Sequence, residues 1–355
     1  MATFNTAISS HQLQTGDHTT GYLAAGPEDG PLIIFVHGWP ELSISWRHQL
    51  PAMAALGFRA VAPDMRGYGR STVYPQLSDY QQRFLVRDLV GLLDGLGADR
   101  AVWVGHDWGS PVVWNMASHH PERCHAVANL CVPYWSIERG WDHLLTLVDR
   151  EVYPIGEYPD GQWDYMRYYE ESFERATAVM DANPYNAVKA LFRRGRPSGQ
   201  NKPTGTALTR RQGGWFGGAD QAPDLEADHD VVSEEDLRIY ADALTTNGFF
   251  GPNAYYRNHQ ANAAYAEEAA NGGELELPVL FIGARYDYTC ETVRSPLAAP
   301  MRQHCGDLTE HIIDSGHWMA QERPAELNAA LAAWLYTRVG SVWPGPAYHG
   351  KARSS

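Results

Sequence analysis

The sequence predicts an α/β fold, in which helices cover both faces of a mostly parallel sheet and a helical cap is inserted in the core. One observation is that short apolar runs alternate with amphipathic segments over residues 31–133. Another is that these runs then stop, aromatic residues become dense, and helical patterns alternate with loops rich in Gly and Pro. We therefore expect a core formed by residues 1–133 and 276–355 and a cap formed by residues 134–275.

Six apolar runs are expected to form strands, because the strands of a parallel sheet are buried on both faces. A helix is expected over residues 84–96, where apolar residues recur at helical spacing until Gly97. A last helix is expected over residues 327–334. The six runs are residues 31–36, 58–62, 101–104, 126–132, 278–283 and 310–313.

The cap is expected to contain helices separated by a long loop. Ser233 and Asp236 form the pattern of a capping box at the start of one helix. Residues 195–230 are polar and rich in Gly, which is typical of a functional lid or of disorder. One face of another helix is expected from Trp163, Met166, Phe173, Thr177 and Met180.

Composition excludes several classes of partner. The chain of 355 residues carries a net charge of −14, so nucleic acid and anionic membranes are not expected to bind it. No apolar stretch approaches the about 20 residues needed to span a bilayer, and the N-terminus lacks the pattern of a signal peptide. The four cysteines show no zinc-binding spacing, which favours reduced thiols and a cytoplasmic enzyme.

Residues 103–111 have the pattern of a nucleophile elbow, a sharp turn from a strand into a helix. Asp107 stands at the position of the nucleophile, between Gly105 and Gly109. These glycines suit a turn that needs unusual backbone angles and close backbone approach. A carboxylate at this position can displace a leaving group from an sp³ carbon and form an ester. Asp107 therefore predicts cleavage of a carbon–oxygen or carbon–halogen bond.

In hydrolases with such an elbow, an acid and then a histidine follow the nucleophile along the chain. His317 is the expected base, because it lies in a loop directly after an apolar run. His304 and His311 are less suitable, since they lie in a helical pattern and inside the run. Asp287, which lies between Asp107 and His317, is the expected acid that orients the base.

Two backbone amides are expected to hold the oxyanion. Trp39 follows the first buried run, and Trp108 follows the nucleophile. Their positions alone suggest this role, because backbone donors have no side-chain signature. His37 and His106 are expected to brace these two loops.

Taken together, these segments resemble the epoxide hydrolases of the α/β-hydrolase fold. The likeness covers roughly residues 20–335, and it resembles the soluble type because no N-terminal membrane segment is present. The resemblance implies that Asp107 opens an epoxide and that His317, oriented by Asp287, activates the water that releases a vicinal diol. No cofactor and no metal are expected. The matching motifs are residues 37–40, 64–71, 105–109, Asp287 and 316–318.

In that family, two cap tyrosines bind the epoxide oxygen and donate a proton. The second lies in a Gly-Pro…Tyr-Arg-Asn segment, which makes Tyr256 its counterpart and leaves Tyr255 at a position that is often tryptophan. The first follows an aspartate early in the cap, which indicates Tyr165. Tyr168 and Tyr169 stay open as alternatives to Tyr165.

Haloalkane dehalogenase is the alternative function, because it uses the same Asp nucleophile. Such enzymes usually carry Asn at the position of Trp39, and a fluoroacetate dehalogenase would have Arg at Trp108. A ligand-binding receptor or a structural protein on the same scaffold would leave the three triad residues without a purpose. The sequence does not name the epoxide, the attacked carbon or the enantiomer, and a homodimer is one open expectation.

Overall fold

The computed structural model describes residues 6–344 and is built on one eight-stranded sheet, in the order β1-β2-β4-β3-β5-β6-β7-β8. β2 is antiparallel to both of its neighbours, and every other neighbouring pair is parallel. The predicted mostly parallel sheet is therefore confirmed. The strands are β1 (Ser9–Thr15), β2 (His18–Ala25), β3 (Leu32–Val36), β4 (Arg59–Pro63), β5 (Ala101–His106), β6 (Cys124–Leu130), β7 (Leu275–Ala284) and β8 (Cys305–Ile313).

The hairpin of β1 and β2 was not among the predicted strands. Thr15 pairs with His18 across a two-residue turn, and Gly16 adopts a φ of +61° there. β1 lies at the edge of the sheet with mostly exposed side chains, so it has no apolar run. The Gly-Asp pair of the turn was the one local signal of a hairpin.

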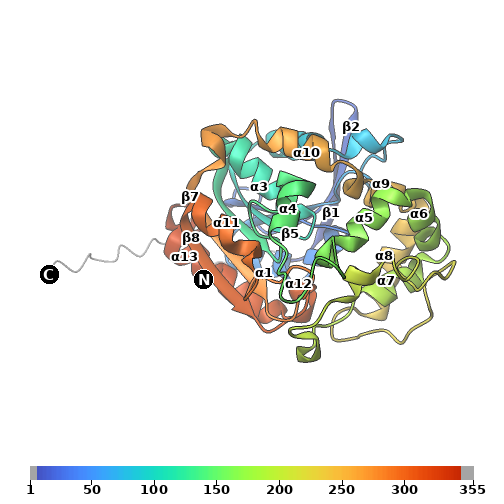
Figure 1. The fold of residues 1–355 in the computed structure, drawn as a ribbon. Coiled ribbons are helices and arrows are strands. Elements are labelled where there is room, and N and C mark those ends of the chain that lie inside the picture. The colour runs from blue at the N-terminus through green and yellow to red at the C-terminus, as the bar shows by residue number, and fades with distance from the viewer. Residues whose placement is uncertain (1–5, 345–355) are drawn as a thin grey trace.

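Helices cover both faces of the sheet, as the alternating pattern predicts (Figure 1). α2 packs against α3, and α1 packs against α13. The helices are α1 (Gln49–Ala55), α2 (Gln82–Gly95), α3 (Gly109–His119), α4 (Trp141–Thr146), α5 (Asp164–Glu171), α6 (Phe173–Asp181), α7 (Pro184–Leu191), α8 (Glu234–Asn247), α9 (Phe250–Ala254), α10 (His259–Ala266), α11 (Ala299–His304), α12 (Met319–Glu322) and α13 (Pro324–Arg338).

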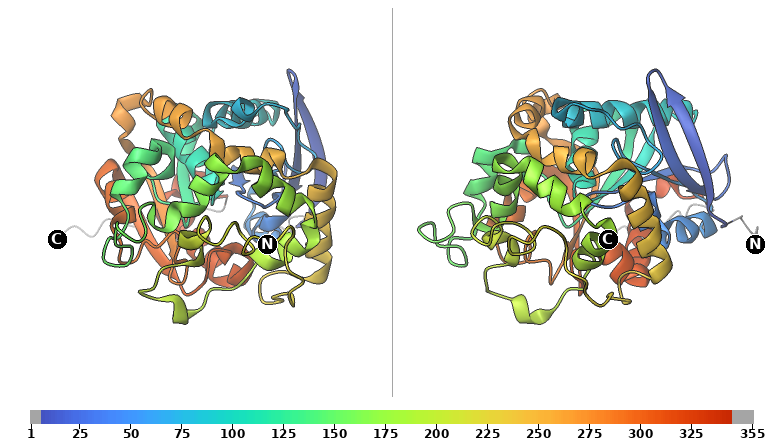
Figure 2. Two further views of the ribbon diagram at one scale, coloured as in Figure 1. Left: turned by 45° about the vertical axis from the view of Figure 1, so that its right-hand side comes forward. Right: turned by 90° about the vertical axis from the view of Figure 1, so that its right-hand side faces the viewer.

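The segment between β6 and β7 carries α4 to α10, and within residues 6–344 no strand interrupts it. Helices α5 to α9 gather at one side of the molecule, on the right in Figure 1 and in front in the right-hand view of Figure 2. Ser233 and Asp236 form the expected capping box at the start of α8. The single helix expected around residues 163–180 is wrong, because Ser172 leaves helical backbone angles and separates α5 from α6.

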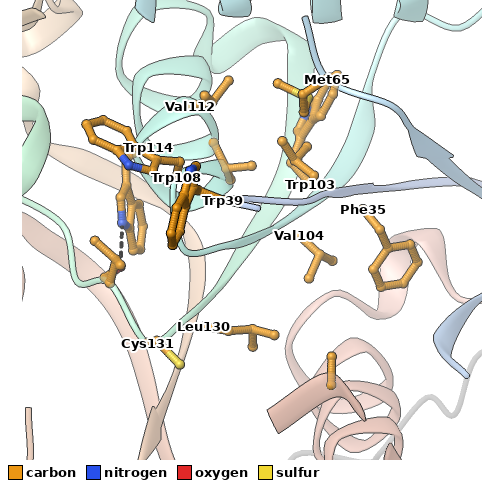
Figure 3. Close-up of a cluster of buried hydrophobic side chains, with 14 of the residues drawn as sticks. Phe35, Trp39, Met65, Trp103, Val104, Trp108, Val112, Trp114, Leu130 and Cys131 are labelled. Carbon is orange, nitrogen blue, oxygen red and sulfur yellow. Dashed lines mark hydrogen bonds between the residues drawn. The ribbon is translucent and has the colours of Figure 1, made fainter. Parts of the chain in front are cut away.

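The sheet and α3 share a core of buried apolar side chains. Phe35 of β3 and Trp103 of β5 are completely buried. Trp114 of α3 is equally buried, and its indole N–H donates to the Val132 carbonyl oxygen at 3.0 Å (Figure 3). Within residues 6–344, no helix has the length and apolar character needed to cross a membrane.

Candidate active site

Asp107 occupies the turn between β5 and α3. Its φ is +50°, in the left-handed region that few non-glycine residues adopt. A side chain at either flanking glycine would clash with neighbouring atoms. A side chain at Gly109 would approach the Val36 carbonyl oxygen to 2.2 Å, and one at Gly105 would approach Asn129 Oδ1 to 2.3 Å. The turn therefore has the geometry of a nucleophile elbow, with the carboxylate held at its tip.

His317 lies between two carboxylates. Its Nδ1 is 2.6 Å from Asp287 Oδ2, and its Nε2 is 3.3 Å from Asp107 Oδ2. Asp287 Oδ1 accepts the backbone N–H groups of Thr289 and Cys290 at 3.2 and 3.0 Å, which fixes the carboxylate. The carboxyl ends of β5, β7 and β8 point the same way because these strands are parallel. The loops that follow these strand ends therefore bring together three side chains that are far apart in the sequence.

The protonation of His317 depends on both carboxylates. Burial acts to lower the pKa of His317, but the charge of Asp287 and hydrogen bonds to Asp107 and Asp287 raise that pKa well above its usual value. Burial acts to raise the pKa of Asp287, but the charge of His317 lowers it. Both carboxylates therefore favour the protonated form of His317 over the neutral ring.

The amide of Trp39 contacts the candidate nucleophile directly. Its N–H donates to Asp107 Oδ1 at 2.7 Å. A side chain at Gly38 would lie 2.4 Å from Asp107 Oδ1 and 2.6 Å from the Trp108 nitrogen, so only glycine leaves this space open. The amides of Trp39 and Trp108 thus border the same small space beside one carboxylate oxygen, where an oxyanion donor pair is needed.

Glu41 and His106 form a buried ion pair beside the His317 loop. The sequence gave no sign of this pair. Glu41 Oε2 is 2.7 Å from His106 Nδ1 and accepts the Gly38 N–H at 2.9 Å. The other oxygen of Glu41 accepts from Gln321 at 3.2 Å. His106 Nε2 lies 2.8 Å from the His317 carbonyl oxygen. This network links the loop of Trp39 to the loop of His317.

Two tyrosines from the helical segment line the same cavity as Asp107. Tyr165 lies in α5, and Tyr256 lies in the turn after α9. Their ring centroids are 5.6 Å apart. Burial, with added effect from the Asp107 carboxylate, raises the pKa of both hydroxyls well above the usual value. Within residues 6–344 neither hydroxyl has a hydrogen-bond partner, so both are neutral donors free to bind an oxygen.

The neighbouring tyrosines are placed differently. The hydroxyl of Tyr255 donates to the Arg66 carbonyl oxygen at 3.0 Å, away from the cavity. Tyr169 stacks on Tyr256 at 4.5 Å and accepts from the Trp215 indole at 3.0 Å. Tyr165 lines the cavity of Asp107, whereas Tyr168 and Tyr169 do not.

The cavity has a volume of about 600 Å³ and contains all three triad side chains. Trp215, from the long loop over residues 195–230, closes one side of it by stacking on Trp39 at 5.6 Å. No periodic pattern in that loop pointed to Trp215. A second cavity of about 460 Å³ shares Tyr288 with the first and contains none of the triad.

Comparison with known proteins agrees with this geometry. The sequence pattern of the α/β-hydrolase fold matches residues 31–324. Epoxide hydrolase A of Mycobacterium tuberculosis is 36% identical over 88% of this chain and 92% of its own length. Bifunctional epoxide hydrolase 2 of Sus scrofa is 34% identical over 87% of this chain and 52% of its own, so the chain spans about half the length of that relative.

A solved structure shows the same likeness. The crystal structure of epoxide hydrolase A from Mycobacterium thermoresistibile matches with a TM-score of 0.76 and 31% identity, and the match covers 93% of this chain and 99% of that one. The fold and the elbow thus define a hydrolase of the α/β-hydrolase fold. Within that fold, the chain belongs to the epoxide hydrolase family.

Proposed function

We propose that this chain hydrolyses an epoxide to a vicinal diol through a covalent ester on Asp107. The observation that carries the proposal is the placement of His317 between Asp107 and Asp287, in a cavity lined by two tyrosines whose hydroxyls have no hydrogen-bond partner among residues 6–344. The names of the relatives support the same activity. The substrate would be a small-molecule epoxide and water.

In the first step, Asp107 attacks a ring carbon. Because Oδ1 is held by the Trp39 amide, Oδ2 is the oxygen left to attack. A bond forms between Oδ2 and the carbon as the carbon–oxygen bond of the ring breaks. Tyr165 or Tyr256 transfers its proton to the ring oxygen, which is strongly basic at that moment. The raised pKa of both hydroxyls keeps the proton available before the reaction.

In the second step, water attacks the Asp107 carbonyl carbon. Ester formation removes the negative charge of Asp107, so one cause of the raised His317 pKa is lost. His317 can then take a proton from water while Asp287 holds Nδ1. Oδ1 becomes the oxyanion beside the amides of Trp39 and Trp108. The bond between Cγ and Oδ2 of Asp107 then breaks, and Oδ2 leaves as the second hydroxyl of the diol with one proton of the water. The water oxygen stays on Asp107 as a carboxylate oxygen, and the other proton of the water restores the tyrosine.

The ester itself is the decisive test. His317→Gln should form the ester and fail to hydrolyse it, so the protein mass should rise by the mass of one epoxide. Digestion should place that mass on the peptide that contains Asp107. Asp107→Ala should neither gain the mass nor form diol, although it stays folded.

The substrate panel should include terminal, aryl and cyclic epoxides beside haloalkanes. Diol from an epoxide without halide release from the haloalkanes is the expected result. Turnover by Asp107→Ala, or label on another residue, would exclude the proposed nucleophile. Faster halide release than diol formation would favour the dehalogenase. The expected cytoplasmic location and homodimer stay predictions.

A further inference from the structure

Two of the four cysteines lie beside His317. The thiol of Cys131 is 3.4 Å from the His317 carbonyl oxygen. Cys290 is on the same loop as Asp287, and it lines the catalytic cavity although only 3% of it is exposed. Neither thiol takes part in the proposed hydrolysis, and each adds a soft metal ligand next to the base.

Asp287, Cys290 and His317 form a compact set of oxygen, sulfur and nitrogen donors. One carboxylate oxygen, the thiol sulfur and one ring nitrogen lie within 4.8 Å of one another. Zinc binds such donors at about 2.0–2.3 Å, which places the donors of a tetrahedral site roughly 3.3–3.8 Å apart. Small side-chain shifts reach that spacing. Because all three residues line the cavity, a fourth ligand position is left open toward it.

A second group, formed by His106, Cys131 and His317, has similar spacing but is less suitable. Both ring nitrogens of His106 are already engaged, one by Glu41 at 2.7 Å and the other by the His317 carbonyl oxygen at 2.8 Å. Cys131 is completely buried and does not line the cavity. An ion arriving through the cavity therefore meets Cys290 rather than Cys131.

Charge also favours the first group. A divalent ion deprotonates a coordinating thiol, and the thiolate and the Asp287 carboxylate together cancel its charge. Such a neutral complex avoids the cost of leaving a net charge buried. The Asp107 carboxylate, 3.3 Å from His317 Nε2, adds attraction for a cation, and Glu41 balances the nearby His106.

We propose that Asp287, Cys290 and His317 form an inhibitory site for a thiophilic divalent cation such as Zn²⁺ or Cd²⁺. In the metal-free ester intermediate, Nδ1–H of His317 donates to Asp287 and Nε2 is free to take a proton from water. A metal on Nδ1 needs that lone pair, so the proton moves to Nε2 and the base is blocked. Ring opening by Asp107 stays available, and this consequence rests on the proposed function. The bound enzyme should therefore consume about one equivalent of epoxide and stop at the ester.

The test is a Cd²⁺ titration of the whole protein, read by the ultraviolet absorption of the cadmium–thiolate bond and by diol formation. The wild type should show one band, with inhibition that follows it and is reversed by EDTA. Cys290→Ser and Cys290→Ala should lose the band and need at least about 10-fold more Cd²⁺ for the same inhibition relative to their own metal-free rate. Cys131→Ser and Cys124→Ser are the matched controls, and both should keep the band.

Several results would overturn the site: a band that survives in both Cys290 variants, a band lost in Cys131→Ser alone, or inhibition of equal strength in all variants. Circular dichroism identifies a variant that has not folded. The cadmium–thiolate band of the wild type is measured on the wild type alone, so it does not depend on the folding of any variant. A cadmium band that depends on Cys290 in a protein that opens no epoxide would support the metal site and refute the proposed function.

Discussion

Replacing Glu41 by Gln removes the carboxylate of the buried ion pair with His106 and keeps the volume of the side chain. Glu41 and His106 are each 1% exposed or less, so neither charge is compensated by water. We predict that Glu41→Gln lowers the free energy of unfolding by about 3 kcal/mol. Because His106 contacts the His317 carbonyl oxygen, the variant should also slow ester hydrolysis more than ring opening.

The magnitude follows from the two pKa shifts. Burial acts to raise the pKa of Glu41, but the charge of His106 lowers it from 4.5 to about 2. Burial acts to lower the pKa of His106, but Glu41 raises it from 6.5 to about 10, with a further contribution from Cys131. At about 1.4 kcal/mol per pKa unit, the shifts correspond to about 3 to 4 and about 5 kcal/mol. The prediction uses the smaller value, because the larger one includes Cys131; the charge of His37 and the Gly38 N–H also contribute to the smaller one.

The stability difference between wild type and variant should depend on pH. The contribution of the lowered Glu41 pKa is present above about 4.5 and is lost as the pH falls through about 2. The contribution of the raised His106 pKa is present below about 6.5 and is lost as the pH rises through about 10. The difference should therefore be largest between about pH 4.5 and 6.5.

Urea unfolding inside this pH window and at about pH 9 measures the effect. The control is Glu274→Gln, which removes the carboxylate of an exposed pair with His304 and should cost less than about 1 kcal/mol. A loss for Glu41→Gln no larger than that of the control, or one that is the same at both pH values, would refute the reasoning.

Three further predictions concern the proposed reaction. Tyr256→Phe should slow single-turnover ring opening about 10²-fold or more. Tyr255→Phe should cost about 1 kcal/mol of stability and leave ring opening near the wild-type rate. If Tyr255→Phe slowed ring opening more than Tyr256→Phe, Tyr256 would not be the proton donor. Tyr165→Phe should slow ring opening more than Tyr168→Phe, because only the former lines the cavity of the nucleophile, and equal rates would contradict this. As the pH falls, protonation of His317 in the ester intermediate should slow ester hydrolysis at a higher pH than it slows ring opening. Rapid-quench mass spectrometry should therefore detect more ester at lower pH. A decrease in ester with falling pH would contradict the role of the base.

Much of the fold follows from the sequence because buried parallel strands need continuous apolar runs. All six expected strands are present, as is the α8 capping box. The edge hairpin of β1 and β2 was missed, because an exposed edge strand needs no apolar run. The break at Ser172 was missed because the apolar spacing continues across it from one helix to the next.

The sequence by itself determined which chemical groups stand at the strand ends: a carboxylate in a glycine-flanked elbow, then an acid and a histidine in later loops. Only the tertiary structure decided the distances between them, since His317 meets both carboxylates through loops far apart in the chain. The same holds for Glu41 beneath His106, Trp215 over Trp39 and Cys290 beside the base. Such contacts arise when the sheet closes, and no local spacing encodes them.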